Sequence, residues 1–217
     1  MPPNAELEAI RKAHIIDAAL RTISVRGCAN VTMDDICRAA GISKGGLTYY
    51  YKSKNEIFKA AFQEFFKHIF IRGAETMSSF EDPLEQVLSF EWLYSTEDPE
   101  SKTAYPILFD FMFIAVHDQE YQEIFSEWVD NWVDLVREAI LRGQAQGRFL
   151  NVDVECASRT ISAIYHGIAT RWYLAPQKHS TQWAVEGTRR AVRGILDSYE
   201  RPTANKKKST SASKSRK

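Results

Sequence analysis

The stretch DDICRAAGISKGGLTYYYKSK, residues 34–54, decides the fold of the N-terminal part of this 217-residue chain. Its first half has apolar residues at helical spacing and stops at Gly41, a residue typical of the position just beyond a helix. Thr32 is a suitable N-cap for this helix, with Asp35 at the capping-box position, and Ser43 is suited to cap the next helix. A sharp turn of three residues containing glycine, residues 41–43, is typical of a helix-turn-helix.

The second helix of the pair is expected to have one anchored face and one small, basic face. Leu47 and Tyr51 should point back toward the preceding helices. The opposite face carries Lys44, Gly45, Thr48 and Tyr49. Each glycine in a helix costs about 1 kcal/mol relative to alanine, so we interpret Gly45 and its neighbour as a place where another molecule comes close. The major groove of DNA admits such a helix and offers base edges to hydrogen-bonding side chains.

Residues that flank this helix are suited to contact phosphates. Tyr50, Lys52 and Lys54 lie at its end, next to the positive N-terminus of a following helix, and Tyr49 suits either a base or a phosphate. The alternative is that the three tyrosines are ordinary core and rim aromatics of a small bundle. The short turn, the glycine pair and the lysines together favour DNA.

Residues 10–58 resemble the TetR family of bacterial transcription regulators. That family has a Thr-capped helix ending in Ile-Ala-x-x-Ala-Gly-Val-Ser, followed by x-Gly-x-Leu-Tyr-x-His-Phe-x-x-Lys. At these positions the chain has Thr32, Ile36, Cys37, Ala40, Gly41, Ile42, Ser43, Gly45, Leu47, Thr48, Tyr50, Tyr51 and Lys54. It departs from the pattern at Cys37, Thr48, Tyr50 and Tyr51. Because the position of Thr48 commonly contacts DNA in the family, the operator sequence does not transfer.

The resemblance also implies that Thr32 and Met33 lie beside a phosphate. The predicted DNA-binding residues are Thr32, Met33, Ser43, Lys44, Gly45, Thr48, Tyr49, Tyr50 and Lys54.

Helical periodicity and capping signals continue to the C-terminal region, and strand signals are nearly absent. We predict an all-α chain of about nine helices. The first two helices are expected at 5–25, with Asn4 as cap, and at 32–41. The third begins at Ser43, the fourth runs from a full capping box at Ser53 to residue 77, and the fifth runs from Pro83 to the polar segment 96–102. The last four are expected at 103–117, 118–146, 153–174 and 180–199. Residues 1–52 would form the helix-turn-helix domain, 53–202 a helical ligand-binding and dimerisation domain, and 203–217 a disordered basic tail.

Charge is partitioned along the chain although the net charge is zero. Residues 1–67 hold 10 basic and 7 acidic residues, 68–200 hold 11 and 21, and 201–217 hold 7 and none. Such asymmetry favours a polyanion partner for the basic ends. The three cysteines are an odd number without short spacing, and there is no secretory signal and no run of about 18 apolar residues. We therefore expect a soluble, cytoplasmic protein with no membrane partner.

The acidic middle region is rich in large aromatic residues, the usual lining of a small-molecule pocket. The predicted ligand-binding residues are Phe90, Tyr94, Phe109, Met112, Phe113, Trp128, Trp132 and Tyr165. The alternative is that a helical core simply needs these side chains. An aromatic, lipid-like or cationic effector is expected, and the acidic balance slightly favours a cation.

The resemblance implies a homodimer through the last two helices, 153–174 and 180–199, whose small residues allow close approach, and a repressor released from a palindromic operator by a small molecule. The alternative is an effector-independent DNA-binding or architectural protein whose second domain only dimerises. No enzymatic activity, cofactor or metal is expected, because the histidines and cysteines lack metal-ligand spacing and no nucleophile or phosphate-loop motif occurs. The effector, the operator and the regulated genes stay open.

Overall fold

The computed structural model describes residues 3–199 and is entirely helical within that range, which confirms the predicted fold class. The α-helices are α1 (Pro3–Arg26), α2 (Met33–Ala40), α3 (Lys44–Tyr50), α4 (Lys54–Ser78), α5 (Pro83–Leu88), α6 (Pro99–Ala115), α7 (Gln119–Ala145), α8 (Val154–Leu174) and α9 (Thr181–Ser198). Two 3₁₀ turns join them, η1 (Cys28–Asn30) and η2 (Phe90–Tyr94). The predicted basic tail, 203–217, lies outside the described residues.

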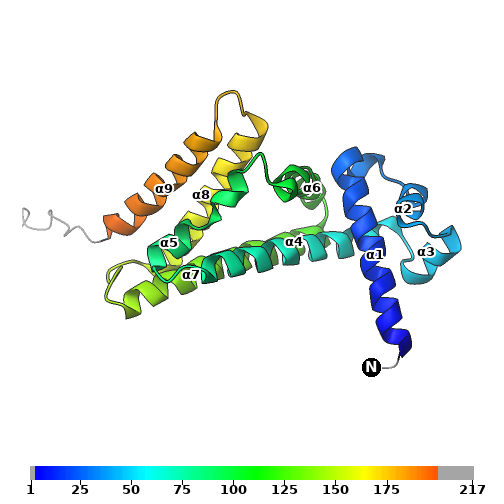
Figure 1. Ribbon diagram of the computed structural model, residues 1–217, viewed down its shortest axis with the longest axis horizontal. Coiled ribbons are helices and arrows are strands. Elements are labelled where there is room, and N and C mark those ends of the chain that lie inside the picture. Colours follow the sequence, from blue (N-terminus) through cyan, green and yellow to red (C-terminus); the bar gives the residue numbers. More distant parts are fainter. Residues whose placement is uncertain (1–2, 200–217) are drawn as a thin grey trace, which may run out of the picture.

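Helices α1, α2 and α3 gather at one end of the molecule, and α8 and α9 lie toward the other (Figure 1). The long helix α4 extends from the first group along α7 and so joins the two ends. Helix α6 lies between α8 and α1 in this view, and it packs against both α1 and α7. Along residues 3–199, no helix has an apolar stretch long enough to cross a bilayer.

The helix-turn-helix is built by the local signals that predict it. The Thr32 hydroxyl accepts a hydrogen bond from the Asp35 amide at 3.2 Å, and the Asp35 carboxylate accepts one from the Thr32 amide at 3.0 Å. Gly41 ends α2 in the left-handed region at φ 63°, where glycine has no steric penalty. The Ser43 hydroxyl then accepts from the Gly46 amide at 3.1 Å and starts α3. The predicted helix-turn-helix is therefore confirmed.

Two predicted N-caps differ from the structure. Helix α1 already begins at Pro3, so Asn4 lies inside it and is not its cap. At α4 the Ser53 hydroxyl accepts from the Glu56 amide as expected, but the Glu56 carboxylate accepts from the Lys52 amide at 2.6 Å. The predicted full capping box is thus only half formed, because Glu56 reaches one residue further back.

The helix expected from Pro83 to the polar segment is interrupted after Leu88 and continues as the 3₁₀ turn η2. The Ser89 hydroxyl donates to the Gln86 carbonyl and so competes with helix continuation. Carbonyl groups in η2 instead accept hydrogen bonds from side chains of other elements. The donors are Ser101 to the carbonyl of Trp92, Tyr105 to that of Leu93, and Thr181 to that of Tyr94.

Helix α6 begins at Pro99, four residues before the predicted start at 103. Asp98 caps it by accepting from the Glu100 amide at 3.1 Å, with proline at the first helical position. The pair Asp82-Pro83 has the same pattern at α5. The start of α6 was therefore present in the sequence, inside a segment interpreted as a polar linker.

Candidate DNA interface and effector cavity

Helix α3 has the two faces that the sequence predicts. Leu47 is fully buried and Tyr51 is 8% exposed, so both anchor the helix. Lys44 and Tyr49 on the other face have about 70% of their surface in solvent. A Cβ added at Gly45 would meet only the Ser43 hydroxyl, at 4.0 Å. The free protein thus gives no steric reason for glycine at this position.

Local bonds orient the polar side chains of this face. Lys44 pairs with Asp34 of α2 at 3.2 Å, across the turn. The Thr48 hydroxyl donates to the carbonyl of Lys44 at 3.0 Å, which leaves its oxygen available to accept a hydrogen bond. Tyr49 and Tyr50 pack edge to face with ring centroids 5.0 Å apart.

The two lysines after α3 have partners within the protein. The Lys52 ammonium donates to the carbonyl of Thr48 at 2.9 Å and so caps the C-terminal end of α3. The half-buried Lys54 donates to the carbonyl of Val31 at 3.1 Å and lies over the Phe58 ring. Lys54 therefore braces the segment before α2, and a direct contact with phosphate would require it to leave these partners. Thr32 and Met33 lie at the start of α2, where the helix N-terminus favours an anion.

Asp35 makes polar contacts with residues of both α1 and α2. The hydrogen bonds from the hydroxyl and amide of Thr32, followed by the bond from the Arg26 guanidinium, lower the pKa of the Asp35 carboxyl from 3.8 to about 2. Arg38 also donates to it, at 3.2 Å. Asp35 thus fixes the end of α1 and the start of α2 at once.

We expect Asp35→Asn to lower the melting temperature at pH 7, because the amide loses the ion pair and part of the capping box. A carboxyl whose pKa is lower in the folded state stabilises above its unfolded pKa and loses that effect as pH falls through the folded value. The difference from the wild type should therefore be full above about pH 5 and shrink as the pH falls toward 2. Asp34→Asn, at an exposed neighbour, is the control and should change stability by less than about 0.5 kcal/mol. A pH-independent difference would contradict this role.

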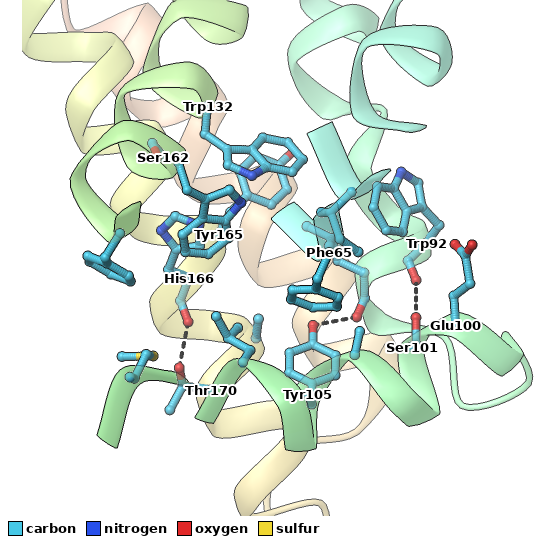
Figure 2. Close-up of a pocket in the computed structure, with 18 of the residues that line it drawn as sticks. Phe65, Trp92, Glu100, Ser101, Tyr105, Trp132, Ser162, Tyr165, His166 and Thr170 are labelled. Atoms are coloured by element: carbon cyan, nitrogen blue, oxygen red, sulfur yellow. Dashed lines mark hydrogen bonds between the residues drawn. The ribbon is translucent and has the colours of Figure 1, made fainter. Parts of the chain in front are cut away.

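A cavity of about 110 Å³ lies among α4, η2, α6, α7 and α8. Met112, Trp128, Trp132 and Tyr165, half of the predicted ligand-binding residues, line it. Figure 2 shows Trp132, Tyr165 and His166 around one part of the pocket and Trp92, Ser101 and Glu100 around another. The lining also includes side chains outside the predicted ligand-binding set, among them Phe65, Trp92, Glu100, Ser162, His166 and Thr170.

The other four predicted residues do not line the cavity. Phe90 and Tyr94 are fully buried beside it, and the Tyr94 hydroxyl is 2.8 Å from that of Thr188 on α9. Phe109 packs against Tyr105 and Tyr173. Phe113 is 71% exposed on the outer side of α6. The predicted ligand-binding residues are therefore distributed among the core, the surface and the cavity lining.

The charged and titratable groups around the cavity are already paired or neutral. Glu100 contacts the ring nitrogen of His68 at 2.7 Å and also pairs with Arg72 of α4. His166 faces the cavity from α8, and burial lowers its pKa from 6.5 to about 4, so the ring is neutral at pH 7. The cavity therefore offers an apolar volume with neutral hydrogen-bonding groups.

Helix α6 connects this cavity with the end of the molecule that carries the helix-turn-helix. Its residues Tyr105 and Met112 line the cavity, whereas Asp110 accepts a hydrogen bond from the amide of Cys28 at 2.5 Å, just after α1. The same carboxylate lies against Gly27, which has φ 74°. Burial, with Asp110 close by, raises the pKa of the Cys28 thiol to about 12. In the sequence, the signal for this contact is Asp110, an acidic residue within the apolar run of residues 105–118.

Comparisons with known proteins agree with this arrangement. The family model of bacterial regulatory proteins, tetR family, matches residues 15–61, and that of the C-terminal domain of BetI-type transcriptional repressors matches residues 83–197, more than half of the chain. The transcriptional repressor KstR2 of Mycolicibacterium smegmatis is 24% identical over 184 residues, 79% of this chain and 83% of that protein. The regulator BetI of Agrobacterium fabrum is 44% identical over 55 residues, 25% of this chain and 27% of that protein.

A solved structure has the same fold at low identity. It is a transcriptional regulator from Saccharomonospora viridis in complex with choline, with a TM-score of 0.73 and 20% identity over 87% of this chain and 96% of that one. The family models, the helix-turn-helix with its exposed face and the helical second part agree. The chain belongs to the TetR family and is a helix-turn-helix transcriptional regulator.

Proposed function

We propose that the protein represses transcription by binding a palindromic operator as a homodimer, and that a small molecule in the cavity releases it. The observation that carries the proposal is the double role of α6. One side of this helix lines the cavity through Tyr105 and Met112, and the carboxylate of Asp110 bonds to the segment that follows α1. A change at the cavity therefore has a direct physical route to α1, α2 and α3.

In this proposal α3 enters the major groove with its exposed face. Lys44 and Thr48 supply donors and acceptors to base edges, and Tyr49 and Tyr50 contact bases or phosphates. Two such helices must face grooves one turn, about 34–36 Å, or a multiple apart. A dimer is therefore part of the proposal, and so is a cytoplasmic location, where bacterial DNA lies.

We propose that the dimer forms through α8 and α9. Of the small residues on these helices, Ser158, Ser162, Ala169 and Ala184 are buried within the subunit. The outward side retains Ala163 and Gly167 on α8 and Gly187, Ala191 and Gly194 on α9. The exposed apolar residues Leu174 and Trp183 lie on the same sides. Such a surface permits close helix packing with a second copy.

The effector-independent alternative requires a filled interior, and the cavity favours an effector instead. We propose no enzymatic role, since the proposed function needs binding alone. Choline, which the Saccharomonospora viridis regulator binds, is one candidate effector. The carboxylate of Glu100, however, is already paired with His68 and Arg72.

The coupling is tested with Asp110→Ala. Couplings between two sites are typically about 1–3 kcal/mol, which corresponds to effector-induced losses of operator affinity of about 5- to 150-fold. The variant should bind the operator within about threefold of the wild type and should respond to effector by less than about threefold. Fluorescence anisotropy gives both values, with operator DNA selected from a random pool by the wild-type protein and with a compound that releases the wild type.

Asp110→Asn is the matched control, because its amide oxygen still accepts from the Cys28 amide and should retain most of the response. Melting temperatures separate lost coupling from lost folding. If the effector lowers the operator affinity of Asp110→Ala as much as that of the wild type, the effect of the ligand does not pass through the contact between Asp110 and Cys28.

A further inference from the structure

Buried polar atoms without a hydrogen-bond partner are concentrated in residues that line the cavity. Within the described part of the chain, four buried side-chain nitrogen or oxygen atoms have no hydrogen-bond partner. They are Nε1 of Trp92, Trp128 and Trp132 and Oγ of Ser162, and all four residues line the cavity. An indole N–H is a donor only. Because natural proteins pair nearly all buried polar groups, this concentration at one place indicates a missing partner.

Three of these residues form one cluster with His166. Trp128 and Trp132 are one helical turn apart on α7, and Ser162 and His166 are one turn apart on α8, so each pair shares a helix face. The Trp128 and His166 rings are in contact, with centroids 4.8 Å apart. Figure 2 shows Ser162, His166 and Trp132 on the same side of the pocket. The neutral His166 ring adds one further donor and one acceptor.

A cation does not suit this cluster. An ammonium ion binds over the face of an aromatic ring, whereas an indole N–H presents positive charge at the edge. Trp128 already stacks on Phe66, with centroids 4.7 Å apart, and contacts the ring of His166 at 4.8 Å. The Trp92 face already carries the Arg72 guanidinium at 4.0 Å. Three of the four unsatisfied atoms are indole N–H groups, which can only donate and therefore require an acceptor.

We propose that the effector is a largely apolar, uncharged molecule whose carbonyl-type oxygen accepts hydrogen bonds from the indole N–H groups of Trp128 and Trp132 and from the Ser162 hydroxyl. The inference deepens the proposed function and rests on it for the consequence of binding. Under this proposal choline, the candidate taken from the Saccharomonospora viridis regulator, is not the effector, and neither are similar quaternary ammonium compounds. The apolar body of the ligand would lie toward Tyr105 and Met112 on α6, the helix that carries Asp110.

Direct binding tests the inference without DNA. The dimeric full-length protein labelled with ¹⁵N at tryptophan gives five indole N–H signals by NMR. Cyclohexanone should move the signals of Trp128 and Trp132 downfield, because the N–H groups gain an acceptor. Methylenecyclohexane has the same shape without the oxygen and should not produce this downfield shift, and choline should leave both signals in place. Trp128→Phe and Trp132→Phe assign the signals.

Two tryptophans are internal controls. The indole of Trp172 already donates to the Thr181 hydroxyl at 3.1 Å, and Trp183 lies on the outer side of α9, so neither signal should follow the ketone. The inference is wrong if choline moves the two cavity signals, if the hydrocarbon moves them as the ketone does, or if cyclohexanone moves neither at saturating concentration.

A serine pair on α8 separates ligand binding from stability. Ser162→Ala should raise the melting temperature of the free protein, because it removes an unpaired buried hydroxyl, and should weaken cyclohexanone binding at least threefold. Ser158→Ala, one turn earlier, removes a hydroxyl that donates to the carbonyl of Glu155 at 3.2 Å. It should lower the melting temperature and leave ketone binding unchanged. If Ser162→Ala is destabilised and binds the ketone normally, the hydroxyl has a structural role and the inference fails.

The two proposals fail in different ways. If the ketone moves the indole signals but no carbonyl compound releases the operator, the release mechanism is wrong and the ligand class stands. If choline releases the operator and moves the same signals, release stands and the ligand class is wrong.

Discussion

Gly45→Leu is expected to lower operator affinity by at least about 100-fold, or about 3 kcal/mol, while the free protein stays folded. The added Cβ has open space, since its nearest neighbour would be the Ser43 hydroxyl at 4.0 Å. Leucine also favours a helix over glycine by about 0.8–1 kcal/mol, so the melting temperature should hold or rise. In the proposed complex the same side chain would lie between α3 and the floor of the groove.

Operator binding by anisotropy and thermal unfolding by circular dichroism give the two values. Gly46→Ala is the contrasting variant, because a Cβ there would lie 3.3 Å from the Ser43 hydroxyl, whose bond to the Gly46 amide caps α3. It should gain less stability than Gly45→Leu, because the close contact with the cap offsets the helix propensity of alanine, and its operator affinity should fall by less than that of Gly45→Leu. Wild-type affinity in Gly45→Leu would mean that this face of α3 does not meet DNA.

The helix-turn-helix could be predicted because its signals are local. Thr32, Asp35, Gly41 and Ser43 act on backbone groups within four residues, and each makes the bond or adopts the conformation that its residue type favours. The role of Lys54 could not be predicted in the same way. Its bond to the carbonyl of Val31 joins residues 23 apart, and only the folded arrangement of α1, α2 and α4 brings them together.

The cavity was only partly predictable because η2 changes the direction of its side chains. The sequence predicts an α-helix through residues 90–94, with Phe90 and Tyr94 on one face toward a ligand. Side chains from α6 and α9 take the carbonyl bonds of this segment and fix a 3₁₀ turn, in which Phe90 and Tyr94 enter the core and Trp92 lines the cavity. Tertiary hydrogen bonds therefore override the local helical preference.

The lining of the cavity was also hard to predict because neighbouring residues of α6 point in different directions. Met112 and Phe113 are neighbours in an apolar run, and hydrophobicity alone ranks them equally. Met112 lines the cavity and Phe113 is exposed, because successive residues on a helix point about 100° apart. His166, the neutral histidine of the cavity, is outside the predicted set, and its burial depends on the contact with Trp128 of α7.

Breaking the proposed dimer should weaken operator binding even more than Gly45→Leu does. We expect the double variant Gly187→Gln, Gly194→Gln to be monomeric and to lose about 1,000-fold in affinity for a palindrome, or about 4 kcal/mol, because each head then binds its half-site alone. Within the subunit the glutamines have room. A Cβ at Gly187 would make an ordinary 3.8 Å contact with Ile168, and one at Gly194 would meet no described atom within 4 Å.

The matched control is Gly187→Ala, Gly194→Ala, which adds only methyl groups and should stay dimeric with nearly normal operator affinity. Light scattering coupled to size-exclusion chromatography measures the oligomeric state, and anisotropy with a full palindrome and with a single half-site measures binding. The glutamine variant should keep wild-type affinity for the half-site, because α3 lies at the opposite end of the molecule (Figure 1). Both pairs of substitutions replace the same glycines, so the two variants differ only in the size of the added side chains. If the glutamine variant stays dimeric, the dimer interface does not lie on these faces of α8 and α9.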